Sequence, residues 1–344
     1  MSAVEFGADE VLLVASRGVE PQHGLWLWRL EAGHWNGRQV DTVRHLSSLA
    51  SHPHLPVVYG TGGGGDDGKL HAWRIDGEVE AVLSVGTSGG IDPCHLSISP
   101  DGEWLVATNY GTSDLSMQRL DGNGAFDGAP SLVALAGGGP DAERQEAAHP
   151  HQAFFVGETL VVIDLGADLV REFSVSSDGL APLSSTAVPP GTGPRHGVVL
   201  DDGRLAISGE LSETLLVGRL GQGAGDWQTV RSTLKTSPAQ TRHTRNYPGD
   251  IQRSADGKYA YLANRSHDTI ATFSVDGAEP RLAGEVDAGA HWPQHILVRD
   301  KHLLIAGWDS SAVVALPLEN GMPQLAVPLF ECGMPGWLHA HRLR

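Results

Sequence analysis

Pro93-Cys94-His95-Leu96-Ser97-Ile98 is the clearest copy of a pattern that recurs along the chain. Each copy begins with proline and continues into a run of residues suited to a β-strand, and successive copies are 42–57 residues apart. The six copies begin Pro93-Cys94-His95, Pro150-His151-Gln152, Pro194-Arg195-His196, Pro248-Gly249-Asp250, Pro293-Gln294-His295 and Pro335-Gly336-Trp337. Self-similarity at this period, in strand-like segments, predicts an all-β protein: a β-propeller built from four-stranded blades.

The repeats predict seven blades in a single domain over residues 1–344. In the first five copies a second apolar run returns, and Asp101-Gly102 is a strong hairpin signal in the third blade. Residues 10–17 form a strand with no proline before it, whereas Pro335 has no second strand after it. We therefore expect residues near 336–343 to pair with residues 10–17, which completes one blade from both ends of the chain and leaves no open sheet edge.

The composition of the chain limits the classes of partner and the compartment that we expect for the protein. The formal charge of −17 argues against nucleic acid, because neutralising phosphates needs clustered lysine and arginine. No run is long and apolar enough to span a membrane, and residues 1–10 do not resemble a secretion signal. The two cysteines, Cys94 and Cys332, lie in different repeats, which favours a reducing compartment. We expect a cytoplasmic protein, a monomer or small homo-oligomer, with a small anionic substrate.

The repeat also predicts where the chemistry lies. The start of each proline-led strand and the end of the strand that returns beside it should meet at one face. Long insertions before Pro150 and Pro248 (residues 137–149 and 236–247) should lie on that face, where binding groups gather on a repeat scaffold. Five charged or titratable side chains occupy these strand ends: Arg17, His151, Arg195, Glu210 and Arg265. His149, Tyr110 and Trp308 lie at or beside the same positions.

A purely structural interpretation competes with this one. Arg195 and Glu210 could form an ion pair that only closes the channel. Other polar residues recur at fixed places in several blades, which indicates packing or turn roles. These are His95, His196 and His295 after the proline, Asn109 and Asn264 at strand ends, and Asp168, Glu213 and Asp268 in hairpins.

Histidine or glutamate can transfer protons, and arginines bind carboxylate or phosphate and stabilise a developing oxyanion. The cluster therefore suits proton transfer or acyl hydrolysis on an anionic small molecule. The chain has no serine in a GxSxG elbow and no HExxH signature. One carboxylate among cations is also a poor calcium site, so we expect neither a metal nor another cofactor.

The sequence resembles the seven-bladed lactonase family, which includes bacterial 6-phosphogluconolactonases and 3-carboxy-cis,cis-muconate lactonising enzymes. The matching stretches are His149-Pro150-His151-Gln152, Asp164-Leu165-Gly166-Ala167-Asp168, Gly193-Pro194-Arg195-His196, Glu210-Leu211-Ser212-Glu213-Thr214 and Asn264-Arg265-Ser266-His267-Asp268-Thr269-Ile270. The resemblance covers essentially the whole chain. It implies a metal-free site in which histidine, arginine and glutamate act together, and by position these are His151, Arg195, Glu210 and Arg265.

Three functions remain open from the sequence. The first is hydrolysis of a sugar lactone, with 6-phosphogluconolactone as the leading substrate, His151 or Glu210 as the base and the arginines holding the acyl oxygen and the anionic group. Arg17, His149, Tyr110 and Trp308 would bind substrate. The second is cycloisomerisation of a carboxymuconate-type lactone by the same residues. The third is a non-catalytic propeller that binds other proteins.

Overall fold

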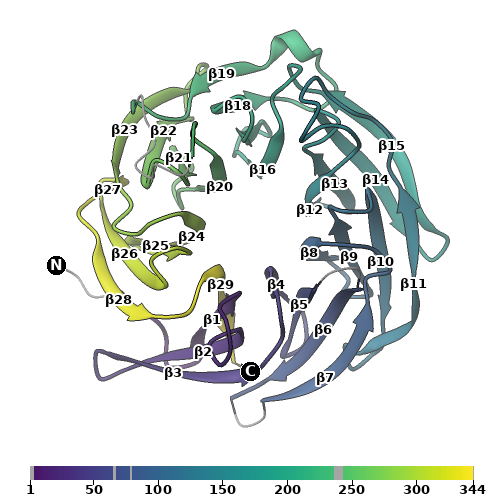
Figure 1. Cartoon of the computed structure of the whole chain (residues 1–344), viewed down its shortest axis with the longest axis vertical. Helices are drawn as coiled ribbons and strands as arrows, with labels where there is room; N and C mark the ends of the chain where they lie inside the picture. The colour runs from purple at the N-terminus through teal and green to yellow at the C-terminus, as the bar shows by residue number, and fades with distance from the viewer. Residues whose placement is uncertain (1–3, 65–66, 78–79, 236–242, 344) are drawn as a thin grey trace. The chain divides into compact units, whose positions relative to one another are not determined.

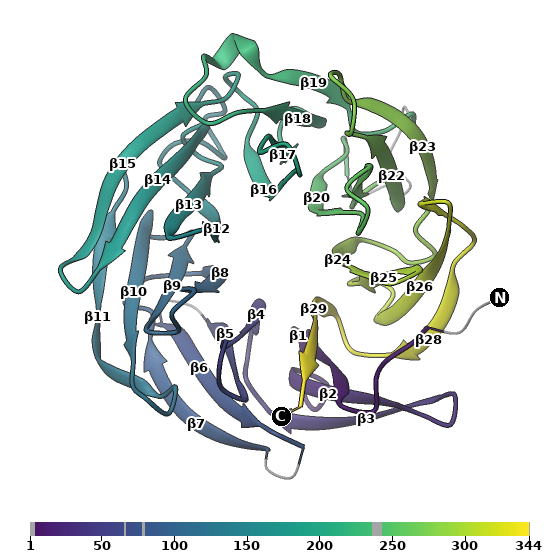
Figure 2. The ribbon, with the colours of Figure 1, turned by 180° about the vertical axis from the view of Figure 1, so that it is seen from behind.

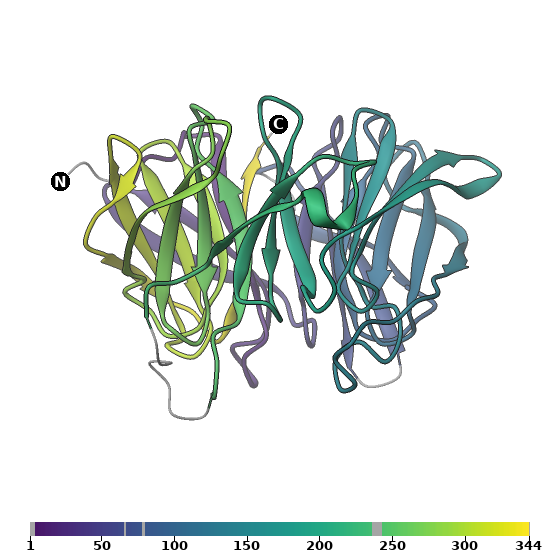
Figure 3. The ribbon, with the colours of Figure 1, turned by 90° about the horizontal axis from the view of Figure 1, so that it is seen from above.

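The computed structural model describes residues 4–64, 67–77, 80–235 and 243–343, where nearly all regular structure is β-strand. Within these ranges the exception is the 3₁₀ helix Ala224–Asp226, the short coil in Figure 3. No helix in the described ranges is long and apolar enough to cross a membrane. Residues 236–242, part of the insertion expected to contribute binding groups, lie outside the described residues.

Contacts between Cα atoms divide the chain into two compact units. The first unit contains residues 6–185 and 339–344, and the second contains residues 1–5 and 186–338. The sequence-based prediction of a single domain over residues 1–344 stays a prediction.

Four blades belong wholly or mainly to the first unit (Figure 1). Blade 1 contains β29 (Pro335–Arg342), β1 (Glu10–Ser16), β2 (Gly24–Glu31) and β3 (His34–Asp41); blade 2 contains β4 (Ser48–Ser51), β5 (Val57–Gly64), β6 (Asp67–Ile75) and β7 (Glu80–Thr87). Blade 3 contains β8 (Pro93–Ile98), β9 (Trp104–Asn109), β10 (Asp114–Leu120) and β11 (Phe126–Ala134); blade 4 contains β12 (Pro150–Val156), β13 (Thr159–Asp164), β14 (Leu169–Ser176) and β15 (Gly179–Ala187).

Three further blades belong to the second unit, so the fold is the predicted seven-bladed β-propeller. Blade 5 contains β16 (Pro194–Val199), β17 (Leu205–Gly209), β18 (Thr214–Gly218) and β19 (Gln228–Arg231); blade 6 contains β20 (Pro248–Arg253), β21 (Tyr259–Asn264), β22 (Thr269–Ser274) and β23 (Arg281–Asp287). Blade 7 contains β24 (Pro293–Arg299), β25 (His302–Gly307), β26 (Ala312–Glu319) and β28 (Val327–Glu331), with the two-residue β27 (Met322–Pro323) also paired to β26.

The last strand completes the first blade, as the sequence predicted. β29 lies beside β1 in one sheet, which the views from the front and from behind both show (Figures 1 and 2). Within the first unit, the Leu343 amide donates to the Asp9 carbonyl at 2.7 Å. The buried His341 ring contacts Ser51 Oγ at 2.8 Å and the Ile75 carbonyl at 2.9 Å, which ties β29 to blade 2.

Proline starts six of the inner strands, and in five of them the pairing register shifts just after it. The shifts lie between Pro93 and His95, Pro150 and Gln152, Pro194 and Gly197, Pro248 and Ile251, and Pro293 and His295. Such bulges re-aim side chains and are common beside functional sites. The residue after each proline is therefore displaced from the regular alternation of the strand.

The hairpin between the second and third strands of five blades turns through a residue with left-handed backbone. These residues are Ser113, Asp168, Glu213, Asp268 and Ser311, with φ from 49° to 58°. The predicted turn roles of Asp168, Glu213 and Asp268 are confirmed. Asn109 and Asn264 also have the predicted bracing role, because Asn109 Nδ2 donates to Asp114 Oδ1 at 2.6 Å and Asn264 Nδ2 to the Ser232 carbonyl at 2.7 Å.

The core lies between the faces of neighbouring blades within each unit. In the second unit, Ala206 and Leu215 of blade 5 pack with Leu262 and Phe273 of blade 6. Strands such as β13, β17 and β25 are buried nearly throughout and supply both faces, which is why their sequences are short apolar runs. Packing of this kind fixes the inner strands and hence the ends at which the polar residues lie.

Candidate active site

Arg195 and Glu210 are brought together by the hairpin of blade 5. Pro194 pairs with Gly209, so the residues that follow them lie at the same end of the blade. The Glu210 amide also donates to the Gly193 carbonyl at 2.9 Å. In this arrangement Arg195 Nε lies 3.2 Å from Glu210 Oε2. The ion pair that the sequence suggested is present.

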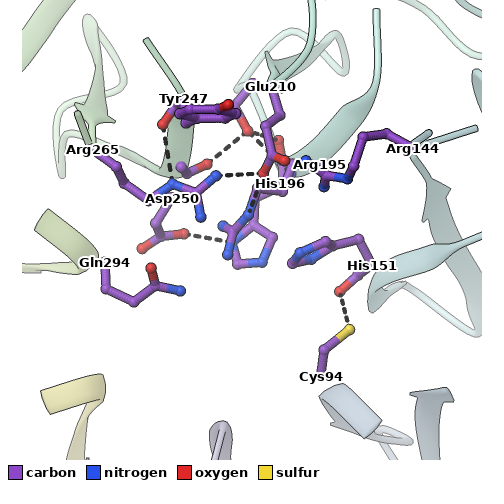
Figure 4. Close-up of polar contacts among 12 residues, drawn as sticks. Cys94, Arg144, His151, Arg195, His196, Glu210, Tyr247, Asp250, Arg265 and Gln294 are labelled. Atoms are coloured by element: carbon purple, nitrogen blue, oxygen red, sulfur yellow. Dashed lines mark hydrogen bonds and ion pairs between the residues drawn. The ribbon is translucent and has the colours of Figure 1, made fainter. Parts of the chain in front are cut away.

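Arg265 reaches the same carboxylate from blade 6, and Figure 4 shows the three side chains together. Its Nη2 donates to Glu210 Oε2, while its Nε donates to the Tyr247 carbonyl at 3.1 Å. Arg195, Glu210 and Arg265 are 4%, 3% and 8% exposed. A buried carboxylate is thus held between two guanidinium groups, each from the end of a different blade.

The cluster contains more positive than negative groups. Two guanidinium groups face one carboxylate. Burial strengthens the electrostatic interactions of all three groups. Guanidinium groups bind carboxylate and phosphate oxygens with paired hydrogen bonds, so the cluster can take an additional negative group from a substrate.

A buried polar network adjoins this cluster through His196, the residue after Arg195. His196 Nδ1 lies 2.8 Å from Asp250 Oδ1, and His295 Nε2 lies 3.4 Å from Asp250 Oδ2. The Ile296 amide donates to Asp250 Oδ2 at 3.0 Å, and the Leu338 amide donates to His295 Nδ1 at 3.3 Å. One carboxylate therefore joins β16, β20, β24 and, through His295, β29.

Protonation in this network follows from burial and hydrogen bonding. Burial lowers the pKa of His196 to about 4, and the neighbouring Arg195 acts in the same direction. Burial also lowers the pKa of His295. For Asp250, burial alone would raise the pKa, but the attraction of His295 and the hydrogen bonds from His196 and the Ile296 amide hold the pKa well below its usual range. At neutral pH, Asp250 is charged, is hydrogen-bonded to the His196 ring and lies beside the His295 ring.

The first unit carries a second group of predicted site residues. The rings of Tyr110 and His149 stack with centroids 4.4 Å apart, and the His151 ring meets Tyr110 edge-on at 5.8 Å. His149 Nδ1 lies 2.8 Å from the Tyr110 carbonyl, and Arg144 Nη2 donates to the Tyr110 hydroxyl at 3.4 Å. Cys94 Sγ donates to the His151 carbonyl at 3.3 Å (Figure 4). His151, His149 and Tyr110 thus form one aromatic cluster.

Arg17 and Trp308 complete the predicted set. Arg17 follows the last residue of β1, and burial lowers the pKa of its guanidinium despite the attraction of Asp92 and Cys94. Trp308 follows β25, and its amide donates to the Trp292 carbonyl at 3.1 Å.

Sequence reasoning missed Asp250, Tyr247 and Trp292. His196 and His295 are buried, which fits the prediction that they have packing roles. That prediction overlooked the Asp250 carboxylate, which lies beside both rings. A signal was available, because Asp250 stands two residues after Pro248, the place that His196 and His295 hold in their own repeats. In the described ranges, no three His, Cys, Asp or Glu side chains come together as a group that could hold a metal ion.

This chain belongs to the lactonase family of seven-bladed β-propellers, because the family model "Lactonase, 7-bladed beta-propeller" matches residues 27–339. It is 28% identical over 255 residues to the 6-phosphogluconolactonase of Bacillus subtilis, covering 72% of each chain. It is 27% identical over 300 residues to the 6-phosphogluconolactonase of Formosa agariphila, covering 80% of this chain and 82% of the relative. The protein is thus a lactonase whose specificity the family does not fix.

Solved structures show the same fold. A protein from Bacteroides fragilis superposes with a TM-score of 0.85 at 24% identity, covering 98% of this chain and 99% of the other. The Pseudomonas aeruginosa periplasmic gluconolactonase superposes with a TM-score of 0.78 at 21% identity, covering 97% and 99%.

Proposed function

We propose that this lactonase hydrolyses 6-phosphogluconolactone to 6-phosphogluconate. The observation that carries the proposal is the buried Glu210 carboxylate held by both Arg195 and Arg265. The cluster has more positive than negative groups, which suits a substrate that bears a phosphate and develops an oxyanion during reaction. The names of the Bacillus subtilis and Formosa agariphila relatives support the same substrate.

The reaction adds one water molecule across the acyl–oxygen bond. A general base removes a proton as the water oxygen attacks the lactone carbonyl carbon, and the carbonyl oxygen becomes an oxyanion. The tetrahedral intermediate then collapses, the ring C–O bond breaks, and the departing alkoxide takes up a proton. The products are a carboxylate, a free hydroxyl and a released proton. An arginine beside the oxyanion lowers the barrier because it stabilises charge that appears only in the transition state.

His151 and Glu210 are the two candidates for the base. Glu210 contacts two guanidinium groups, so its carboxylate is already engaged by two cations from different blades. This favours a role in which Glu210 holds the arginines in place. An imidazole titrates near neutral pH, so His151 suits proton transfer better. We assign the base to His151 and the orientation of the arginines to Glu210.

The direct test is a pH-stat assay of proton release from 6-phosphogluconolactone, with the unphosphorylated glucono-δ-lactone as the matched neutral substrate. We expect the phosphorylated lactone to have the lower KM, and His151→Ala to lower kcat by about 10²–10⁴ with little change in KM. Carboxymuconate turnover, followed by ultraviolet absorbance, with no lactone hydrolysis would instead favour cycloisomerisation. Activity on neither class would favour a binding propeller.

A further inference from the structure

Trp292 has a backbone conformation that is unfavourable for its side chain. Its φ is 54°, in the left-handed region, directly before Pro293. Asp92, Gly193 and Met334, at the same place in three other copies of the repeat, also have positive φ, of 51°, 54° and 44°. Glycine adopts this conformation without steric cost, whereas a bulky residue is strained there. The backbone shape therefore recurs with different side chains, so the repeat itself does not require an indole at this position.

Neighbouring residues hold Trp292 in this conformation. The Trp292 amide donates to Asp268 Oδ1 at 2.8 Å, and the other Asp268 oxygen lies 2.7 Å from His291 Nδ1. The Trp292 Nε1 donates to Gln294 Oε1 at 3.0 Å. Asp268 is the turn residue three positions after Arg265, so the hairpin that carries the arginine also fixes the tryptophan.

The indole lies against Arg265. The Arg265 Cζ atom is 5.2 Å from the centroid of the Trp292 ring, within cation–π range. The same guanidinium contacts Glu210 through Nη2 and the Tyr247 carbonyl through Nε (Figure 4). Two hydrogen bonds in the plane of a guanidinium and an aromatic face against it together define its orientation.

Two further rings enclose the indole. The His243 ring centroid lies 4.5 Å from that of Trp292, and the Tyr247 centroid lies 6.1 Å away. The Arg245 Cζ atom lies 5.3 Å from the centre of the Tyr247 ring. This aromatic packing keeps the indole from rotating away from Arg265.

We propose that Trp292 is a positioning residue, whose indole holds the Arg265 guanidinium in the orientation in which it contacts both Glu210 and the substrate. The proposal rests on the role of Arg265 in the proposed function. It gives the side chain at this strained position a role that the backbone conformation alone does not require.

The test compares Trp292→Gly, Trp292→Leu and Trp292→Phe. The glycine variant relieves the backbone strain and keeps the Asp268 bond, so we expect it to fold with a melting temperature near that of the wild type. We expect its kcat/KM for 6-phosphogluconolactone to fall by up to about 10²-fold, because a mutation remote from the reacting bond can cost that much when it displaces a group that positions the substrate. Phenylalanine keeps an aromatic face and should restore most of the activity, whereas leucine should not.

A double-mutant cycle separates positioning from general structure. In an Arg265→Ala background, Trp292→Gly should cause no further loss, because there is no guanidinium left to hold. Additive losses would overturn the proposal, as would equal activity of the leucine and phenylalanine variants or full activity of the glycine variant.

A readout without turnover keeps this inference distinct from the proposed function. In protein labelled with ¹⁵N-arginine, the Arg265 Nε–H resonance should move on Trp292→Gly, since the indole ring current is lost, and return towards its wild-type position in Trp292→Phe. If the wild type hydrolyses no lactone but this resonance behaves as described, the proposed function fails and the positioning contact stands. A resonance that does not move overturns the positioning role.

Discussion

Glu210 is the residue at which the arginines of two blades meet, and its substitution separates catalysis from stability. We expect Glu210→Gln to lower kcat/KM by about 10²–10³, because the neutral amide no longer holds both guanidinium groups beside the reacting carbonyl. If the contacts are only structural, the melting temperature will fall and turnover per folded molecule will be normal. Both quantities should be measured on one preparation.

Asp164 offers a matched control for that experiment. Its buried Oδ2 accepts hydrogen bonds from Arg171 Nε at 2.9 Å and Nη2 at 2.8 Å, so it too is a buried carboxylate held by a guanidinium. Asp164→Asn should lower the melting temperature without changing kcat. A loss of kcat as large as that of Glu210→Gln would show that such substitutions act through the fold.

The lowered pKa of His196 predicts how the stability of the fold depends on pH. Its pKa is near 6.5 in an unfolded chain and about 4 in the fold, so between these values the unfolded state binds more protons. Stability should therefore fall as pH decreases from 6.5 towards 4, by on the order of 3 kcal/mol. Urea denaturation at several pH values measures this. His196→Asn, which keeps a donor towards Asp250, should flatten the slope, and an unchanged slope would contradict the assignment.

At the level of residues, the sequence predicted the Arg195–Glu210–Arg265 group because the repeat places strand ends side by side. It did not predict Trp292 or Tyr247, which precede their prolines and contact Arg265 through a ring face and a backbone carbonyl. Such contacts depend on the left-handed backbone of Trp292 and on the register shifts after Pro248 and Pro293. Neither feature changes the apolar pattern of the strands, so the sequence pattern does not reveal them. That His151 acts in the same reaction stays a prediction.

The strands themselves were largely predictable. Six strands begin at the prolines that define the repeat, and β2 spans Gly24–Glu31 as expected from its alternating pattern. Proline lacks a backbone donor and suits the first residue of a strand, which explains why it marks these starts. The register shifts after the prolines were not predictable, because a bulge inserts a residue without altering composition.

β29 is the element whose contacts can be tested individually. We expect His341→Ala to lower the free energy of unfolding by about 1–3 kcal/mol, because Ser51 and the Ile75 carbonyl lose a buried partner. Arg342→Ala, which removes an exposed ion pair with Asp9, should leave the melting temperature nearly unchanged. Deleting residues 335–344 should cost far more than either. A truncated protein that melts like the full chain would contradict the importance of this strand.

Considered as a whole, the molecule is acidic, with a formal charge of −17, whereas the arginine cluster is locally positive. We expect lactonase activity to survive EDTA, since Ca²⁺ requires six to eight oxygen ligands and two guanidinium groups repel a cation. The assay compares chelated enzyme before and after calcium or zinc is added back. Loss of activity that either metal restores would show this expectation to be wrong.

The pairing of β29 with β1 also has a consequence for synthesis of the protein. More than 300 residues separate Glu10–Ser16 from Pro335–Arg342. At translation rates of about 5–20 residues per second, β1 leaves the ribosome roughly 15–65 s before its partner strand. Throughout that interval the nascent chain carries one strand with an unpaired edge, which is open to pairing with other chains. The exposure ends only once Pro335–Arg342 has been translated and pairs with β1.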